Sequence, residues 1–159
     1  MDPIIHAFVE EAGNTTQSIG LGRVVGQIYA YLYFSREPRN LADMQEALGI
    51  SKGSASTGVR QLEQWGGARK VWVKGDRKDY YAADDWFGQI VKSAVTELVG
   101  RKMASYGSLL DEVEGRLAAL EGSGDGKGEF VRERVKNLRR FQKRAEQVWA
   151  SPLVQHFLK

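Results

Sequence analysis

The chain has 159 residues, of which 42% are hydrophobic and 27% are charged, and its net charge is +3, which are proportions typical of a globular protein. Because it contains no cysteine and only two histidines, His6 and His156, its composition excludes disulfides and thiolate sites, and we expect no metal and no cofactor. No segment reaches the roughly 18 consecutive apolar residues of a membrane-spanning helix, and the first three residues do not open a signal peptide. We therefore expect a cytoplasmic protein that does not bind membranes.

Two helices are predicted before residue 38. The second starts after Gly20 or Gly22 and continues to about Glu37, where Pro38 ends it. It is apolar on most sides, so we expect it to be largely buried. The first has one apolar face and is expected to stop near Gly13; its apolar positions are Ile4, Ile5, Phe8, Val9 and Ala12.

A pair of short helices joined by a tight turn is predicted next. The first covers residues 41–48, and Gly49 provides a residue that tolerates positive φ at its C-terminus. Ser51 is a suitable N-cap for the second helix, which ends at Gly66 and Gly67. One face of this second helix is apolar, with Ala55, Val59 and Leu62, and the opposite face carries Lys52, Gly53, Ser56, Thr57, Arg60 and Gln64.

The sequence then changes from helical to strand periodicity. Residues 68–73 predict one strand, residues 74–77 a turn and residues 78–82 a returning strand, which together make a two-stranded hairpin with a basic tip. We expect Asp76 and Asp79 to orient the neighbouring Arg and Lys side chains or to close the turn. Between residues 51 and 81 there are seven cations and three anions, an excess of four that is larger than the net charge of the whole chain.

The rest of the chain is predicted to be helical. A long helix runs from Asp84 or Asp85 to about Leu120, with glycines that weaken or bend it. The glycine-rich residues 122–128 predict a flexible loop. An amphipathic helix then covers about residues 129–150, and a short helix follows from Ser151. The expected fold class is mainly α with a small two-stranded β wing: a winged helix-turn-helix with long dimerisation helices.

The order helix, turn, helix and basic hairpin predicts binding to double-stranded DNA. The second helix of the pair has the right length to lie in the major groove, where its small N-terminal residues allow close approach and Arg60 can pair with guanine. Arg77 at the hairpin tip is the best candidate for the minor groove, because a narrow groove concentrates negative potential. The predicted DNA-binding residues are Ser51, Lys52, Gly53, Ser54, Ser56, Thr57, Arg60, Lys74, Arg77 and Lys78.

These residues also carry a family resemblance. Residues 48–66, LGISKGSASTGVRQLEQWG, and residues 71–81, VWVKGDRKDYY, closely resemble the GbsR branch of the MarR-type transcriptional regulators. Residues 20–33, GLGRVVGQIYAYLY, and residues 85–88, DWFG, fit the same branch, so that the likeness covers about residues 1–100. The resemblance implies a dimeric repressor or activator, often encoded near genes for osmoprotectant uptake or synthesis.

A homodimer is also expected from the apolar seam of the long helix, which a small DNA-binding module cannot cover alone. Each recognition helix would then read one half of a pseudo-palindromic operator, with half-site centres about 34 Å apart. We expect an N-terminal dimerisation helix in residues 1–19, the winged helix-turn-helix in residues 20–84 and a helical dimerisation region in residues 85–159. The residues predicted to contact the second subunit are Ile5, Phe8, Val9, Leu109, Val113, Leu117, Leu120 and Phe141.

Several alternatives remain open at this point. Trp65, Trp72 and Trp86 are interpreted as core residues rather than as an aromatic cage for a quaternary ammonium. If a small-molecule effector binds, we expect its pocket between the winged module and the dimerisation helices, with contributions from Tyr29, Tyr33, Trp86 and Ile90. The basic residues 132–144 are interpreted as a solvated helix face rather than as a second DNA surface. No nucleophile has an evident base, so we expect no catalytic residue; the competing function is a winged-helix module that binds another protein.

Overall fold

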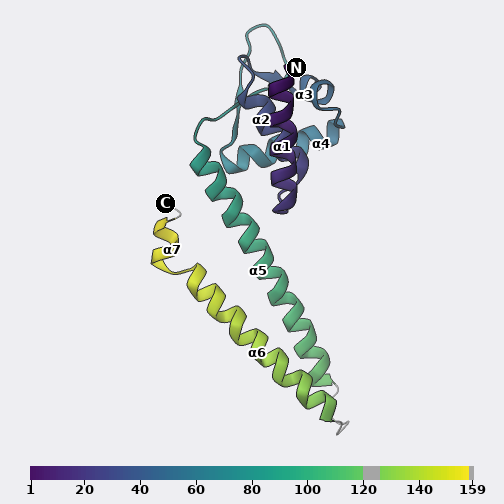
Figure 1. Cartoon of the computed structure of the whole chain (residues 1–159), viewed down its shortest axis with the longest axis vertical. Helices are drawn as coiled ribbons and strands as arrows, with labels where there is room; N and C mark the ends of the chain where they lie inside the picture. Colours follow the sequence, from purple (N-terminus) through teal and green to yellow (C-terminus); the bar gives the residue numbers. More distant parts are fainter. Residues whose placement is uncertain (120–125, 158–159) are drawn as a thin grey trace. The chain divides into compact units, whose positions relative to one another are not determined.

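The computed structural model describes residues 1–119 and 126–157, which form two compact units that divide between Val95 and Thr96. The first unit contains α1 (Pro3–Ser18), α2 (Arg23–Tyr33), β1 (Arg39–Asn40), α3 (Leu41–Leu48), α4 (Lys52–Trp65), β2 (Ala68–Val71), β3 (Tyr80–Ala83) and the start of α5 (Phe87–Ala119) (Figure 1). The second contains the rest of α5, α6 (Gly126–Trp149) and α7 (Pro152–Phe157). The predicted fold class, mainly helical with a small β wing, is confirmed.

Two glycines allow α1 and α2 to cross at close range. A Cβ added to Gly26 would lie 2.2 Å from the carbonyl oxygen of Ala12, and a Cβ on Gly13 would lie 2.7 Å from Cγ of Gln27. The prediction that the first helix stops near Gly13 is therefore wrong: α1 continues to Ser18. Gly13 serves the contact between the helices and does not end one of them.

The second helix is shorter than predicted. It ends at Tyr33, where the N–H of Phe34 still donates to the carbonyl of Ala30, and not near Glu37. Pro38 disfavours the helical conformation at the residue before it, Glu37, and so a helix cannot easily continue through Glu37. The chain then becomes extended to form β1, which the sequence did not predict.

The sheet has three antiparallel strands in the order β1-β3-β2 rather than the expected two. Arg39 of β1 is paired with Tyr81 of β3, and Val71 of β2 with Tyr80. A strand of two residues is too short to show an alternating pattern, so its existence depends on the partner strand. β2 and β3 are also shorter than the predicted strands, which leaves residues 72–79 as the loop of the wing.

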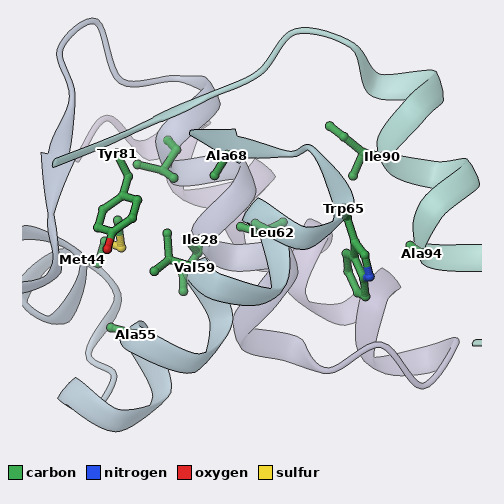
Figure 2. Close-up of a cluster of buried hydrophobic side chains, with 11 residues drawn as sticks. Ile28, Met44, Ala55, Val59, Leu62, Trp65, Ala68, Tyr81, Ile90 and Ala94 are labelled. Carbon is green, nitrogen blue, oxygen red and sulfur yellow. The ribbon is translucent and has the colours of Figure 1, made fainter. Parts of the chain in front are cut away.

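A single cluster of apolar side chains fills the first unit (Figure 2). Ile28 from α2, Met44 from α3 and Val59 and Leu62 from α4 are almost completely buried. Burial of such a side chain stabilises the fold by roughly 1.5–3 kcal/mol. Ala55, Val59 and Leu62 all point into this cluster, as the sequence predicts, and so the opposite face of α4 is turned outward.

The three tryptophans near the wing have different environments. Trp65 is only 4% exposed and belongs to the core, as predicted. The same prediction is wrong for Trp72 and Trp86, which are 78% and 76% exposed. Trp72 lies in the wing loop beyond the last paired residue of β2, and Trp86 lies just before α5, so neither is covered by the sheet or by a helix of the first unit.

In the second unit, α6 returns beside α5 and is held by Arg139. This side chain donates to Asp111 at 2.5 Å and to Glu114 at 2.9 Å, and its guanidinium lowers the pKa of Glu114 below the usual value. Gly107 does not break α5; a Cβ there would lie 2.8 Å from Nε2 of Gln142 on α6. Residues 126–128 are helical rather than part of the predicted loop, and residues 120–125 lie outside the described residues.

None of the helices in the described ranges combines the length and the apolar character that are needed to cross a bilayer.

Candidate nucleic-acid interface

The N-terminus of α4 is organised by Ser51. Its hydroxyl accepts a hydrogen bond from the N–H of Ser54 at 3.1 Å and lies 2.9 Å from the Ser54 hydroxyl. The cap leaves other N–H groups of the first turn free for a partner, and the end of a helix attracts a negative charge such as a phosphate. Apart from its chain neighbours and its own helix backbone, the described residues place one atom within 4 Å of an added Cβ on Gly53, the Ser51 hydroxyl oxygen at 3.8 Å. An approaching backbone would therefore meet little obstruction there.

Arg60 lies two turns along the same outward face. Its Nη2 donates to the hydroxyl of Ser56 at 2.9 Å, which directs the guanidinium back along α4 toward the N-terminus. An arginine has five N–H donors, so several remain for another acceptor. Arg60 is exposed and Ser56 half-buried on this side of α4, while Gly58 on the other side packs so closely that a Cβ would lie 2.7 Å from Cδ1 of Ile28.

The wing loop is closed by Asp76. One carboxylate oxygen accepts from the N–H of Lys78 at 2.9 Å and the other accepts from the hydroxyl of Tyr80 at 2.8 Å. These two hydrogen bonds lower the pKa of Asp76 below its usual value, so that the carboxylate stays ionised. Gly75 adopts the positive φ of 88° that the turn requires. The prediction that Asp76 closes the turn is confirmed.

The second acidic residue of the wing is also engaged. Asp79 accepts from Lys70 of β2 at 3.1 Å across the exposed hairpin, and this hydrogen bond raises the pKa of Lys70. Both anions of the wing are therefore paired within the wing. The three cations of the tip, Lys74, Arg77 and Lys78, are exposed, and their side chains form no ion pair with the described residues.

All ten residues predicted to bind DNA are at the surface of the first unit. Ser54 and Ser56 are half-buried by their helix neighbours, and the other eight are exposed. They form two groups, the outward face of α4 and the tip of the wing, which the short connection through Gly66 joins. We call these two groups together the basic face: Ser51, Lys52, Gly53, Ser54, Ser56, Thr57, Arg60, Lys74, Arg77 and Lys78.

Sequence reasoning missed three side chains beside this face. Arg69 and Lys70 of β2 and Trp72 in the wing loop are exposed. The sequence signal for them was the presence of two basic residues and a tryptophan, in the stretch Arg69-Lys70-Val71-Trp72, directly before the turn. In an antiparallel hairpin with only one face buried, such a run places some of its members toward solvent.

The residues proposed for an effector pocket do not share one environment. Tyr29 and Tyr33 are neighbours, with ring centroids 5.8 Å apart, and the Tyr29 hydroxyl donates to the carbonyl of Asp84 at 3.3 Å. Ile90, by contrast, is buried in the core of the first unit, and Trp86 is exposed. Since a core side chain does not face a ligand, Ile90 does not fit the expected pocket.

The residues expected at a dimer interface also differ in their exposure to solvent. Val9 is 1% exposed inside the first unit, packed within its own chain, and so is unavailable to a second subunit. Leu120 lies outside the described residues. Exposed apolar side chains are found at Phe8, Leu109 and Phe141, and half-buried ones at Ile5, Val113 and Leu117.

Known proteins resemble this chain in sequence. No family model matches it. The HTH-type transcriptional repressor OpcR of Bacillus subtilis (strain 168) is 30% identical over 124 residues, which cover 74% of this chain and 67% of OpcR. The HTH-type transcriptional repressor GbsR of the same organism is 33% identical over 79 residues, which cover 50% of this chain and 43% of GbsR. The HTH-type transcriptional regulator MmpR5 of Mycobacterium tuberculosis (strain ATCC 25618 / H37Rv) is 33% identical over 81 residues, or 50% of this chain and 49% of MmpR5.

The fold is also found among solved structures. The crystal structure of a transcriptional regulator matches 99% of this chain and 100% of its own, with a TM-score of 0.56 and 24% identity. At that identity the likeness concerns the fold. The match with OpcR covers two thirds of that repressor, whereas the matches with GbsR and MmpR5 cover less than half of either protein. The chain belongs to the MarR family of winged helix-turn-helix transcriptional regulators and, within it, to the GbsR-type branch.

Proposed function

We propose that this protein is a sequence-specific DNA-binding transcriptional regulator that acts as a homodimer and represses its target genes from a pseudo-palindromic operator. The observation that carries the proposal is the basic face, whose cations are exposed while the neighbouring anions Asp76 and Asp79 are held within the wing. The relatives OpcR and GbsR are both named as repressors, which supports repression rather than activation. DNA binding also places the protein in the cytoplasm, and no enzymatic step is needed.

Each half of the basic face has its own task in this proposal. The first turns of α4 enter the major groove, where small side chains permit close contact and Arg60 pairs with guanine through its planar fork. The wing follows the backbone, and Arg77 enters the minor groove. Ser51 and Lys52 lie at the end of α4 where a phosphate is favoured.

A second copy of the chain is the partner that best explains the apolar surface of the second unit. On α6, Phe130, Phe141 and Val148 are exposed and lie 11 and 7 residues apart, so that they share one side of the helix. Tyr106 and Leu109 of α5 are exposed as well. Large apolar side chains that stay exposed along one side of a helix are typical of an interaction site. In the first unit, Phe8 is exposed and its ring packs at 5.3 Å on that of Phe34.

A mobility-shift titration of the full chain against its own promoter region tests the proposal. Arg60→Ala should bind the operator less well while keeping its affinity for unrelated DNA, because it removes a base contact. Arg77→Ala should weaken binding to all sequences. It should also reduce the slope of log K against log salt concentration by about 1, because one phosphate contact is lost. Lys102→Ala, at an exposed position of α5, provides the matched control and should bind like the wild type.

Two outcomes would contradict DNA binding. One is the absence of any shift at moderate salt, and the other is an affinity that does not change between low and high salt. A contact with phosphates releases counterions, so its affinity must fall as salt rises. A salt-independent affinity would favour the competing function, a winged-helix module that binds another protein.

A further inference from the structure

We propose that the first unit contains a binding site for a small zwitterion, a molecule with a carboxylate and a separate cationic group. The site is a cavity of about 830 Å³ bounded by the N-terminal part of α1, the C-terminal end of α2, the segment that leads into β1, and α3. This volume falls within the range of pockets that hold small molecules, about 300–1,000 Å³. None of the residues discussed for DNA binding lines it.

The first observation is a hydrogen-bond donor without an acceptor. Arg39 lines the cavity, and its guanidinium forms no hydrogen bond or ion pair with the described residues; its buried Nε has no acceptor either. A buried N–H group normally has an acceptor, and an exception calls for a missing partner. A carboxylate fits this guanidinium well, because its two oxygens can accept from two N–H groups of an arginine at once.

Tyr31 adds a second unused donor to the same wall. Tyr31 lines the cavity, and its hydroxyl makes no hydrogen bond with the part of the chain that the structure describes. Burial raises the pKa of Tyr31 above its usual value, so the hydroxyl keeps its proton and can donate. The side chains of Arg39 and Tyr31 can therefore both donate hydrogen bonds to an anionic group.

The second observation is the acidic character of the rest of the wall. Four residues with a carboxylate line the cavity, against three that carry a basic group, Met1 with the terminal amine, Arg36 and Arg39. Two of the four, Asp2 and Asp43, already accept backbone N–H groups at their helix N-termini, at 2.8 and 2.9 Å. The other two, Glu37 and Glu46, are exposed and form no ion pair with any described residue. They are free to receive a cation.

These observations together select the class of ligand. A simple anion would satisfy Arg39 but would face a wall in which carboxylates outnumber guanidinium groups. A simple cation would pair with Glu37 and Glu46 but would leave the guanidinium of Arg39 without a partner. A molecule that carries both charges satisfies both ends, and the ring of Phe34 gives its middle part an apolar contact.

The position of the site links it to the basic face. Arg39 is in β1, which pairs with β3 of the wing through Tyr81, and Glu46 is in α3, which packs against α4. Arg39 and Glu46 thus belong to elements that contact the wing and α4, which carry the DNA-binding residues. We therefore expect the ligand to change the affinity for DNA, a consequence that rests on the proposed function, and DNA to change the affinity for the ligand by the same factor.

Calorimetric titration of the full chain without DNA tests the site. The probes are the ω-amino acids glycine, 4-aminobutyrate and 6-aminohexanoate, with hexanoate and hexylammonium as half-ligands that carry one charge each. At least one ω-amino acid should bind saturably, and at least tenfold more tightly than both half-ligands. The proposal is overturned if no ω-amino acid binds, or if either half-ligand binds as tightly as the best of them.

Two variants assign the binding to this cavity. Arg39→Gln and Glu46→Gln should each weaken binding of the ω-amino acid at least tenfold, while Glu133→Gln, on an exposed position of α6, should not change it. Unchanged binding in Glu46→Gln, whose side chain is exposed and not needed for folding, would overturn the site even if Arg39→Gln does not fold. Mobility shifts of Glu46→Gln without ligand should match the wild type, so that a failure of ligand binding is distinguished from a failure of DNA binding.

Discussion

At the scale of single residues, the wing depends on a carboxylate in a region that must face phosphates. Asp76 is an anion next to Arg77 and Lys78, and simple electrostatics would make it unfavourable for DNA binding. Its oxygens, however, accept from the N–H of Lys78 and the hydroxyl of Tyr80. Asp76 thereby holds the loop that presents the cations. Asp79 differs, because it only pairs with Lys70 on the exposed hairpin.

This difference predicts opposite effects of two similar substitutions. Asp76→Ala should weaken DNA binding several-fold although it removes a negative charge, because the loop loses both hydrogen bonds. Asp79→Ala should leave binding unchanged or tighten it, because Lys70 becomes available to a phosphate. Fluorescence anisotropy with labelled operator DNA measures both. Tighter binding by Asp76→Ala would mean that the residue acts by its charge alone.

The same residue predicts how the wing responds to pH. The pKa of Asp76 is held below its usual value in the folded chain. A depressed pKa means that the stabilisation is fully present above the usual pKa of an aspartate and is lost as the pH falls through the lowered value. The wing should therefore keep its structure from neutral pH down into the acid range.

At the scale of the elements, the first unit depends on how closely its helices approach each other. Gly26 allows α2 to lie against the backbone of α1, and Gly58 allows α4 to lie against Ile28 of α2. The α4 helix is thus held by its apolar side, and its opposite side remains free for DNA. A change that moves α2 away from its neighbours should loosen the whole unit.

Gly26→Ala tests this packing. The added Cβ would lie 2.2 Å from a backbone oxygen that cannot move by a side-chain rotation, so the free energy of unfolding should fall by about 1–3 kcal/mol, the usual cost of overpacking. Gly115→Ala is the matched control, because it lies in α5 and the described residues outside its own helix backbone place no atom within 4 Å of the added Cβ. That change should raise helix stability by up to about 1 kcal/mol. Urea unfolding followed by circular dichroism compares the two, and equal effects would refute the close contact.

At the scale of the whole molecule, the proposed regulator needs two copies to read a pseudo-palindromic operator. The exposed apolar side chains of α5 and α6 in the second unit support this association. The basic residues 132–144 of the same helix do not form one free cationic surface, since Arg139 is bound to Asp111 and Glu114. The ion pairs of Arg139 therefore favour the interpretation that residues 132–144 form a solvated helix face. They argue against a second DNA-binding surface.

Phe141→Asp should separate the proposed dimer into monomers. The side chain is 73% exposed in the single chain, so the monomer should remain folded, whereas a charge placed in a buried interface is strongly unfavourable. Sedimentation velocity would measure the mass, and the mobility shift on a palindromic operator should weaken in parallel. Gln147→Asp, exposed elsewhere on α6, should leave both results unchanged. A Phe141→Asp protein that sediments like the wild type would place the interface elsewhere.

The sequence by itself determined the features that depend on neighbours along the chain. Ser51, Gly49 and Gly66 mark the ends of the two helices, the spacing of Ala55, Val59 and Leu62 orients α4, and the residues around Gly75 close the wing, because caps, helical faces and turns involve residues a few positions apart. Nearly all of the basic face was predictable for that reason.

Only the tertiary structure decided the features that depend on residues far apart in the chain. It placed Gly13 inside a helix, added β1 as a third strand, buried Val9 and exposed Trp72 and Trp86. It also brought Arg39, Tyr31 and Glu46 to one cavity. The periodicity of a sequence shows which side of a helix or strand is apolar. It does not show which other element covers that side. The covering element decides which side chains are buried and which hydrogen-bond donors stay unpaired.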